Sequence, residues 1–175
     1  MNPYIQLAQI AIEEYINNGK IISVPNNLPR EFYEKQSGVF VTIRIDKNLR
    51  GCIGTYLPAR KNIAEEIIQN AISACSQDNR FPPITREELP LLDIEVSLLS
   101  NPQKITNLKE LDQEKFGVIV KCRDGRCGLL LPNLEGVDSV KKQLTIACQK
   151  GGIDPNLDKD LEIYKFSVTK FSGEK

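Results

Sequence analysis

Residues 38–56 constrain the fold more than any other part of the chain. Residues 38–46, GVFVTIRID, alternate between apolar and polar side chains and are rich in β-branched residues, which is typical of a half-buried strand. Lys47 and Asn48 follow as a turn, and residues 49–56 return as a second strand. Two strands joined by so short a turn pair antiparallel, so the chain needs a layer that covers the apolar face of this hairpin.

Three segments with helical periodicity supply that layer. Residues 3–18 repeat apolar side chains at helical spacing, with Asn2 before them as a cap. Residues 62–77 begin at a capping asparagine, and residues 137–150 end before Gly151, which suits the position after a helix. The sequence therefore predicts three long helices.

Further strands are predicted at residues 91–100, 116–122, 126–131 and 161–171. The second and third of these are joined around Asp124-Gly125, a strong signal for a hairpin. Hairpins mixed with helices indicate an α+β fold with a mainly antiparallel sheet flanked by helices. A chain of 175 residues fits a single domain, residues 1–175.

Charge and cysteine content narrow the possible partners and the compartment. The chain has 23 basic and 23 acidic residues, whereas a general nucleic-acid binder carries a basic excess, so no nucleic-acid partner is expected. There is no signal-peptide pattern at the N-terminus and no apolar run of membrane-spanning length. Five cysteines at irregular spacing do not form a disulfide framework, and we expect a cytoplasmic protein.

The chain contains no histidine, which removes many kinds of active site. Ser-His-Asp and Cys-His pairs and His-based zinc sites are excluded, so any chemistry must use Cys, Asp, Glu, Lys, Tyr or Arg. Cys122 and Cys127 could supply half of a metal site, but the other half is absent, and a packed hairpin pair is favoured. We expect no metal and no cofactor.

The returning strand contains the best candidate for a functional site, LRGCIG at residues 49–54. The apolar face of the hairpin is continuous if Ile43 pairs with Ile53, and this register places Arg44 near Cys52 and Arg50. Neighbouring guanidinium groups favour a thiolate. One hypothesis is therefore that Cys52 is a nucleophile and that Arg50 binds an anionic group.

A structural interpretation of the same motif stands beside this hypothesis. Cysteine is among the residues most often buried without reactivity. Gly51 and Gly54 suit the close approach of a ligand or of another chain segment, but glycines in strands also mark bulges and tight packing.

Three charged residues elsewhere are further candidates for the site. Asp78 and Arg80 follow the second predicted helix and could form a binding rim with Arg50, or a local salt bridge. Glu95 lies among apolar residues of a predicted strand and needs a partner. It could be a catalytic carboxylate, or the salt-bridge partner of Arg44 or Arg50, which we favour.

Several segments together resemble the AMME chromosomal region (AMMECR) protein family. They are LRGCIG (49–54), GVFVT (38–42), DNRFPPIT (78–85), EELPLLDIEVSLLS (87–100), GLLLP (128–132) and EIYKF (162–166). The resemblance implies an α+β fold with a main antiparallel sheet, a smaller lobe, and the hexapeptide near a groove between them. Two family features are missing here: a tryptophan near the start of the third long helix and a histidine before GLLLP.

The resemblance implies partners but no specific activity. Bacterial and archaeal members of this AmmeMemoRadiSam type are often encoded beside a Memo-like protein and a radical SAM protein, which suggests a shared pathway. We therefore expect a binding or accessory component that works with these proteins through the LRGCIG groove. The alternative is a cysteine-dependent enzyme that acts on an anionic small molecule or a modified protein. The oligomeric state stays open.

Overall fold

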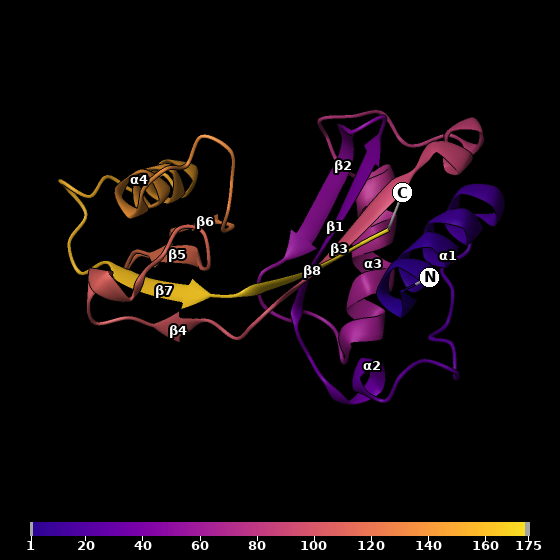
Figure 1. Cartoon of the computed structure of the whole chain (residues 1–175), viewed down its shortest axis with the longest axis horizontal. Coiled ribbons are helices and arrows are strands. Elements are labelled where there is room, and N and C mark those ends of the chain that lie inside the picture. The colour runs from indigo at the N-terminus through magenta and orange to yellow at the C-terminus, as the bar shows by residue number, and fades with distance from the viewer. Residues whose placement is uncertain (1, 174–175) are drawn as a thin grey trace. The chain divides into compact units, whose positions relative to one another are not determined.

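A computed structural model, in which residues 2–173 are described, shows an α+β fold with two four-stranded sheets that are packed with helices (Figure 1). The α+β class and the antiparallel pairing predicted from the sequence are confirmed. The chain forms two compact units. Unit 1 is the chain up to Leu99 together with the segment from Thr169 onward, and unit 2 is Ser100–Val168.

Unit 1 is a sheet of strand order β2-β1-β3-β8 with helices on one face. The helices α1 and α3 lie side by side against this sheet (Figure 1). The elements are α1 (Pro3–Asn18), α2 (Glu31–Glu34), β1 (Gly38–Ile45), β2 (Asn48–Thr55), α3 (Ile63–Ser76), the 3-10 helix η1 (Arg86–Leu91), β3 (Asp93–Leu99) and β8 (Val168–Ser172).

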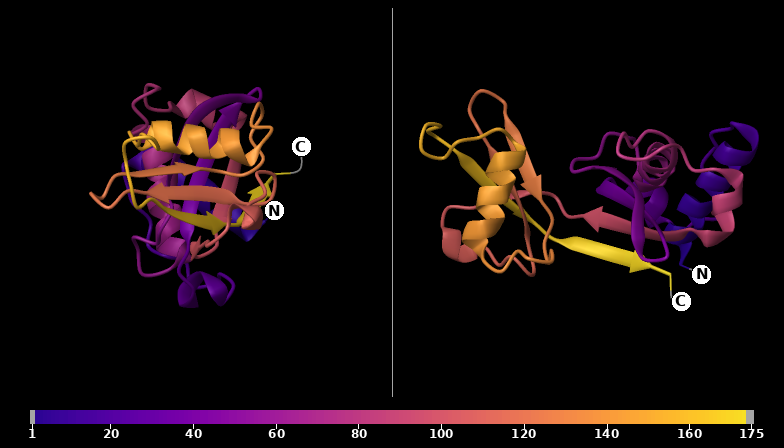
Figure 2. Two further views of the ribbon diagram at one scale, coloured as in Figure 1. Left: turned by 90° about the vertical axis from the view of Figure 1, so that its left-hand side faces the viewer. Right: turned by 90° about the horizontal axis from the view of Figure 1, so that it is seen from above.

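Unit 2 is a smaller sheet of strand order β4-β7-β5-β6. The helix α4 packs on β5 and β6, as Figure 2 shows in its left view. The elements are β4 (Gln103–Lys104), the 3-10 helix η2 (Leu108–Glu110), β5 (Gly117–Lys121), β6 (Cys127–Leu130), α4 (Val140–Lys150) and β7 (Glu162–Phe166).

The ends of the helices follow from local capping. The Asn2 side chain accepts a hydrogen bond from the amide of Tyr4, and Gly19 ends α1 with a φ of 66°. The α1 helix therefore has the predicted bounds. The α4 helix begins three residues later than predicted, because Ser139 caps it and accepts from the amide of Lys142.

The turn of the first hairpin differs from the prediction. It lies at Asp46 and Lys47, whose φ angles of 49° and 68° fit the two-residue turns that match strand twist. The predicted turn was one residue later. The pairing also shifts between Ile43 and Arg44, as in a β-bulge, so the two effects together change the register.

The predicted pairing of Ile43 with Ile53 is consequently wrong. Ile43 lies opposite Gly51, Val41 lies opposite Ile53, and the direct partner of Cys52 on β1 is Thr42. The shift is an even number of residues, so the faces are preserved. Val41 and Ile43 are fully buried in the core under the helices.

The last predicted strand, residues 161–171, is two strands in two different sheets. Ser167 separates β7 from β8, and its carbonyl accepts from the amide of Ser100 while its own amide donates to the Ser100 hydroxyl. The short β4 and α2 were not predicted, because proline and asparagine around them indicated loops.

Two cysteines belong to the core, as predicted. Cys75 and Cys148 are 2% and 5% exposed. Burial raises the pKa of the Cys75 thiol to about 11, so this thiol stays protonated at neutral pH. No helix among the described residues is long and apolar enough to cross a membrane.

Candidate functional site

Arg50 fastens β2 to the segment that follows α3. Its Nε and Nη2 donate to the two carboxylate oxygens of Glu88, at 2.7 and 3.0 Å. Its Nη1 donates to the carbonyl of Pro82 at 2.8 Å, and Nη2 also reaches the carbonyl of Pro83 at 3.3 Å. Every nitrogen of the guanidinium group thus has an acceptor within the chain. The hydrogen bond from Arg50 also lowers the pKa of Glu88.

The two glycines of LRGCIG are required by close packing within unit 1. A Cβ atom at Gly51 would overlap the carbonyl oxygen of Ala74 on α3. A Cβ atom at Gly54 would overlap the ring of Phe40 on β1. The close approach foreseen from the sequence is therefore made by chain segments, and these glycines bring β2 against α3 and under an aromatic ring.

Asp78 and Arg80 occupy the outer edge of β2 at Cys52. The amide of Cys52 donates to Asp78 Oδ2 at 2.9 Å, and the carbonyl of Cys52 accepts from Arg80 Nη2 at 3.2 Å. The same guanidinium donates to both oxygens of Asp78, at 2.9 and 2.7 Å. The pair supplies the acceptor and the donor that a neighbouring strand would supply, so it protects an edge strand from pairing with another chain.

Burial of the carboxylate makes this Asp–Arg pair a stabilising one. The Asp78 side chain is 5% exposed, whereas that of Arg80 is 56% exposed. Hydrogen bonding from the Arg80 guanidinium, helped by the Cys52 amide, holds the pKa of Asp78 well below its usual range. Asp78 is therefore ionised at neutral pH.

The face of the sheet that carries Cys52 is polar. Cys52 Sγ lies 3.2 Å from the hydroxyl of Thr42, and Glu95 on β3 is the partner of Thr42 on the other side. Arg44 Nη1 lies 3.8 Å from Glu95 Oε2, which confirms the favoured prediction that Glu95 has a salt-bridge partner. Cys52 itself is half-buried.

The clamp formed by Arg50, Asp78 and Glu88 holds one surface loop in place. This rim loop, residues 79–83 (NRFPP), begins directly after Asp78 and is held at its end by the Pro82 and Pro83 carbonyls. The Arg80 guanidinium lies over the ring of Phe81, 5.5 Å from its centroid. The predicted candidates thus meet at one place: Arg50, Cys52, Asp78 and Arg80 fix the rim loop.

Glu66 is a buried carboxylate that the sequence analysis missed. It is 1% exposed and accepts from the Thr55 hydroxyl at 2.6 Å and from the amides of Ala59 and Arg60, both at 2.8 Å. It thereby fixes the chain between β2 and α3. The only signal in the sequence was a glutamate on an otherwise apolar helix face, four residues before Asn70.

A second group of side chains has the composition of a metal site. Among the described residues, Cys122, Asp124 and Asp158 bring one ligand atom each within 4.8 Å of one another. Arg126 lies among them and donates to Asp124 Oδ2 at 2.8 Å and to Asp158 Oδ1 at 2.5 Å. Hydrogen bonding from Arg126 lowers the pKa of Asp124 to about 2. The guanidinium already neutralises these carboxylates, so the group carries no argument for a cation.

The fold and the clamped strand define an α+β protein with two helix-covered antiparallel sheets, in which LRGCIG organises a surface loop. Residues 5–171 match AMMECR1, and the chain belongs to this family. A protein of Thermotoga maritima is 47% identical over 171 residues, which are 97% of both chains. Protein CA_C1420 of Clostridium acetobutylicum is 44% identical over 97% of this chain but only 36% of its own length. The crystal structure of the uncharacterized protein PH0010 from Pyrococcus horikoshii has a TM-score of 0.88 and 36% identity, covering 98% of this chain and 90% of that chain.

Proposed function

We propose that this chain is a binding or accessory component that holds a partner protein at the rim loop. The observation that carries the proposal is the commitment of the charged groups of the motif. Each nitrogen of the Arg50 guanidinium already donates to an acceptor within the chain, and the Asp78–Arg80 pair hydrogen bonds to the amide and the carbonyl of Cys52. Charged side chains that hold a loop in place prepare a binding surface, but they are not free to act as catalytic groups.

The rim loop presents the residue types that dominate protein interfaces. Arginine and aromatic side chains are enriched among the residues that contribute most to binding. Arg80 and the two prolines are exposed, and Phe81 is half-buried beneath the guanidinium. Because the clamp fixes this loop before binding, little conformational entropy is lost when a partner docks.

The partners that we propose are a Memo-like protein and a radical SAM protein. This proposal rests on the family resemblance. In the relative from Clostridium acetobutylicum the matched region is 36% of a longer chain, so this type of domain also occurs joined to further sequence. All five cysteines are free, which fits the reducing cytoplasm that we propose as the compartment.

Calorimetric titration of the purified chain with each candidate partner from the same host tests the proposal. Phe81→Ala should weaken binding at least tenfold while the melting temperature stays within a few degrees, since the ring is not part of the clamp. Leu108→Ala, on η2 of unit 2 and 54% exposed, is the matched control and should bind as the wild type does. Equal affinities for the two variants, or no binding by the wild type, would exclude the rim loop as the docking site.

A cysteine-dependent enzyme acting on an anionic small molecule or a modified protein is the second candidate. One observation favours it: the Cys52 thiol is half-buried and 3.2 Å from a hydroxyl, so a small reagent could reach it. Cys52→Ser separates the two functions. An enzyme loses turnover and retains binding, whereas a binding protein tolerates the change. Alkylation of the native protein at the rate of an ordinary thiol would also count against a nucleophile.

A further inference from the structure

The segment that follows α1 is extended and makes no main-chain pairing. Among the described residues, no hydrogen bond is formed by the main chain of residues 21–24. Ile22 and Val24 pack against the core of unit 1, which anchors the segment, while Ile21 is 62% exposed. An anchored, extended main chain with free amides and carbonyls has the properties of an open strand edge.

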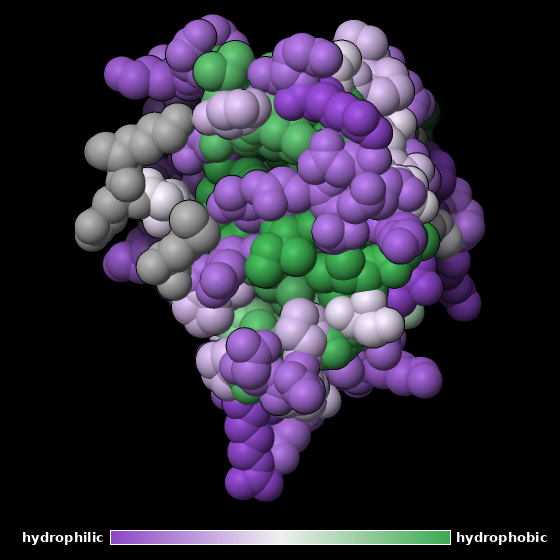
Figure 3. All heavy atoms as spheres, turned by 90° about the vertical axis from the view of Figure 1, so that its right-hand side faces the viewer, coloured by the Kyte–Doolittle hydropathy of each residue, from purple (hydrophilic) through white to green (hydrophobic). Residues whose placement is uncertain are grey.

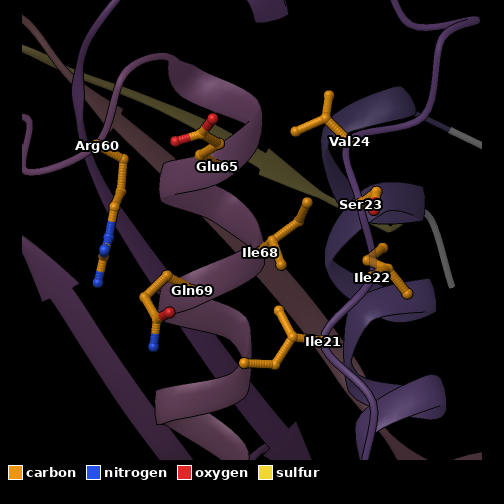
Figure 4. Close-up of a pocket in the computed structure, with 8 residues that line it drawn as sticks. All are labelled: Ile21, Ile22, Ser23, Val24, Arg60, Glu65, Ile68 and Gln69. Atoms are coloured by element: carbon orange, nitrogen blue, oxygen red, sulfur yellow. The ribbon is translucent and has the colours of Figure 1, made fainter.

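A groove lies between this segment and α3. Its volume is about 430 Å³, within the range of natural binding pockets, and it is open to solvent. Figure 4 shows Ile68 extending from α3 toward the segment, and Ile21 extending from the segment toward the helix. Ile68 is 4% exposed and gives the groove an apolar floor.

The polar side of the groove contains one cation, Arg60, and one carboxylate, Glu65. Arg60, Glu65 and Gln69 line it together with the apolar residues (Figure 4). The Glu65 carboxylate accepts from the amide of Lys61 at 3.4 Å. Within the described part of the chain, the Arg60 guanidinium has no hydrogen-bond or salt-bridge partner. An anionic group would therefore find a donor at this end of the groove.

We propose that this groove binds an extended peptide strand of a partner protein, distinct from docking at the rim loop. The peptide pairs its main chain with residues 21–24, places an apolar side chain between Ile21 and Ile68, and directs a carboxylate to Arg60. Strand addition to an open edge takes its affinity from main-chain hydrogen bonds and its specificity from pockets for alternate side chains. A peptide fits better than a compact metabolite, because four consecutive residues offer unpaired main-chain groups in a row.

A random peptide library displayed on phage tests the proposal without knowledge of the natural ligand. The library is selected on the whole wild-type chain after removal of phage that bind an Ile21→Glu variant. Leu91→Glu is the matched control, since Leu91 is an exposed apolar residue of the same unit, 52% exposed, and does not line the groove. Apolar exposure on unit 1 is not confined to the groove, since Leu57 and Leu91 are also exposed. Figure 3 shows hydrophobic patches between hydrophilic residues on one face of the molecule.

The expected result is a set of proline-free peptides with alternating apolar residues and an acidic residue. They should bind the wild type and the Leu91→Glu variant equally, and Ile21→Glu and Arg60→Ala at least tenfold more weakly. N-methylation of alternate peptide amides, synthesised in both registers, should abolish binding in one register. Three results would overturn the proposal: no peptide that distinguishes wild type from Ile21→Glu, indifference to N-methylation in both registers, or a change of oligomeric state in Ile21→Glu, which would assign the groove to a second copy of the chain.

Discussion

Asp78–Arg80 in unit 1 and Asp124–Arg126 in unit 2 have the same local geometry. In each pair the arginine amide donates to the aspartate Oδ1, at 3.2 and 3.0 Å, and the arginine Nε donates to the same carboxylate, at 2.9 and 2.8 Å. Two residues of spacing are thus enough to form this pair at two unrelated places in the fold.

The surroundings make the two pairs physically different. The Asp78 side chain is 5% exposed and accepts the amide of a strand residue, whereas the Asp124 side chain is 51% exposed at a hairpin tip. An exposed ion pair contributes little to stability, because water competes for both charges. Removal of a buried carboxylate that accepts from a main-chain amide lowers the free energy of unfolding, because the buried amide is left without an acceptor. The contribution of an Asp–Arg pair to stability therefore depends on how deeply the carboxylate is buried and on whether it also accepts a hydrogen bond from a third group, here the Cys52 amide.

The largest expected effect is a loss of stability when the close contact between a strand glycine and a helix, which each unit has, is disturbed. A Cβ atom at Gly51 would overlap the carbonyl of Ala74, and one at Gly128 would overlap the carbonyl of Ala147. Gly51→Ala and Gly128→Ala should each lower the free energy of unfolding by about 2–3 kcal/mol, since a strand must move off its helix. Urea denaturation measures the loss. Gly173→Ala, where nothing lies within 4 Å, is the control and should be neutral.

The second effect tests the difference between the ion pairs. Asp78→Ala should lower the free energy of unfolding by about 2 kcal/mol, because the Cys52 amide loses its acceptor. Asp124→Ala should change it by less than about 1 kcal/mol, because the pair is exposed and Arg126 keeps its bonds to Asp158. Chemical denaturation of both variants measures the two changes in the free energy of unfolding. Equal losses would show that burial does not separate the two pairs.

A smaller effect is expected in the pH dependence of the free energy of unfolding. The hydrogen bond from Arg80 lowers the pKa of Asp78, so the unfolded chain takes up its proton first as the pH falls. The stabilisation from ionised Asp78 is complete above the unfolded pKa of about 4 and is lost as the pH falls toward the lower folded value. The stability gap between wild type and Asp78→Asn should therefore be widest at pH 7 and narrow below about pH 5. A gap independent of pH would contradict the role of the charge.

The smallest effect concerns the thiol beside the first ion pair. Cys52→Ser should change the free energy of unfolding by less than about 1 kcal/mol, because the side chain is half-buried and a hydroxyl can keep the contact with Thr42. Thermal denaturation is sufficient to measure it. A loss as large as that of Asp78→Ala would place the thiol, rather than the Asp78 carboxylate, at the centre of the clamp.

Local signals in the sequence were enough to place the three long helices and to assign the faces of the strands. Asn2 and Gly19 defined α1 because caps act within a few residues. The hairpin register was missed because the bulge between Ile43 and Arg44 leaves no mark in an alternating pattern. The role of Arg50 could not be predicted either, since its acceptors lie 32 to 38 residues away and include main-chain carbonyls, which every residue type has.

The strand order of the first sheet bears on how the protein folds as it is made. Unit 2 is inserted between β3 and β8, so β3 acquires its outer neighbour only when residues 168–172 have left the ribosome. Until then, β3 in the nascent chain has β1 on one side and no strand on its other flank. The synthesis of β8 is therefore the step that allows this flank to close and Phe171 to stack on Tyr4 from the first helix.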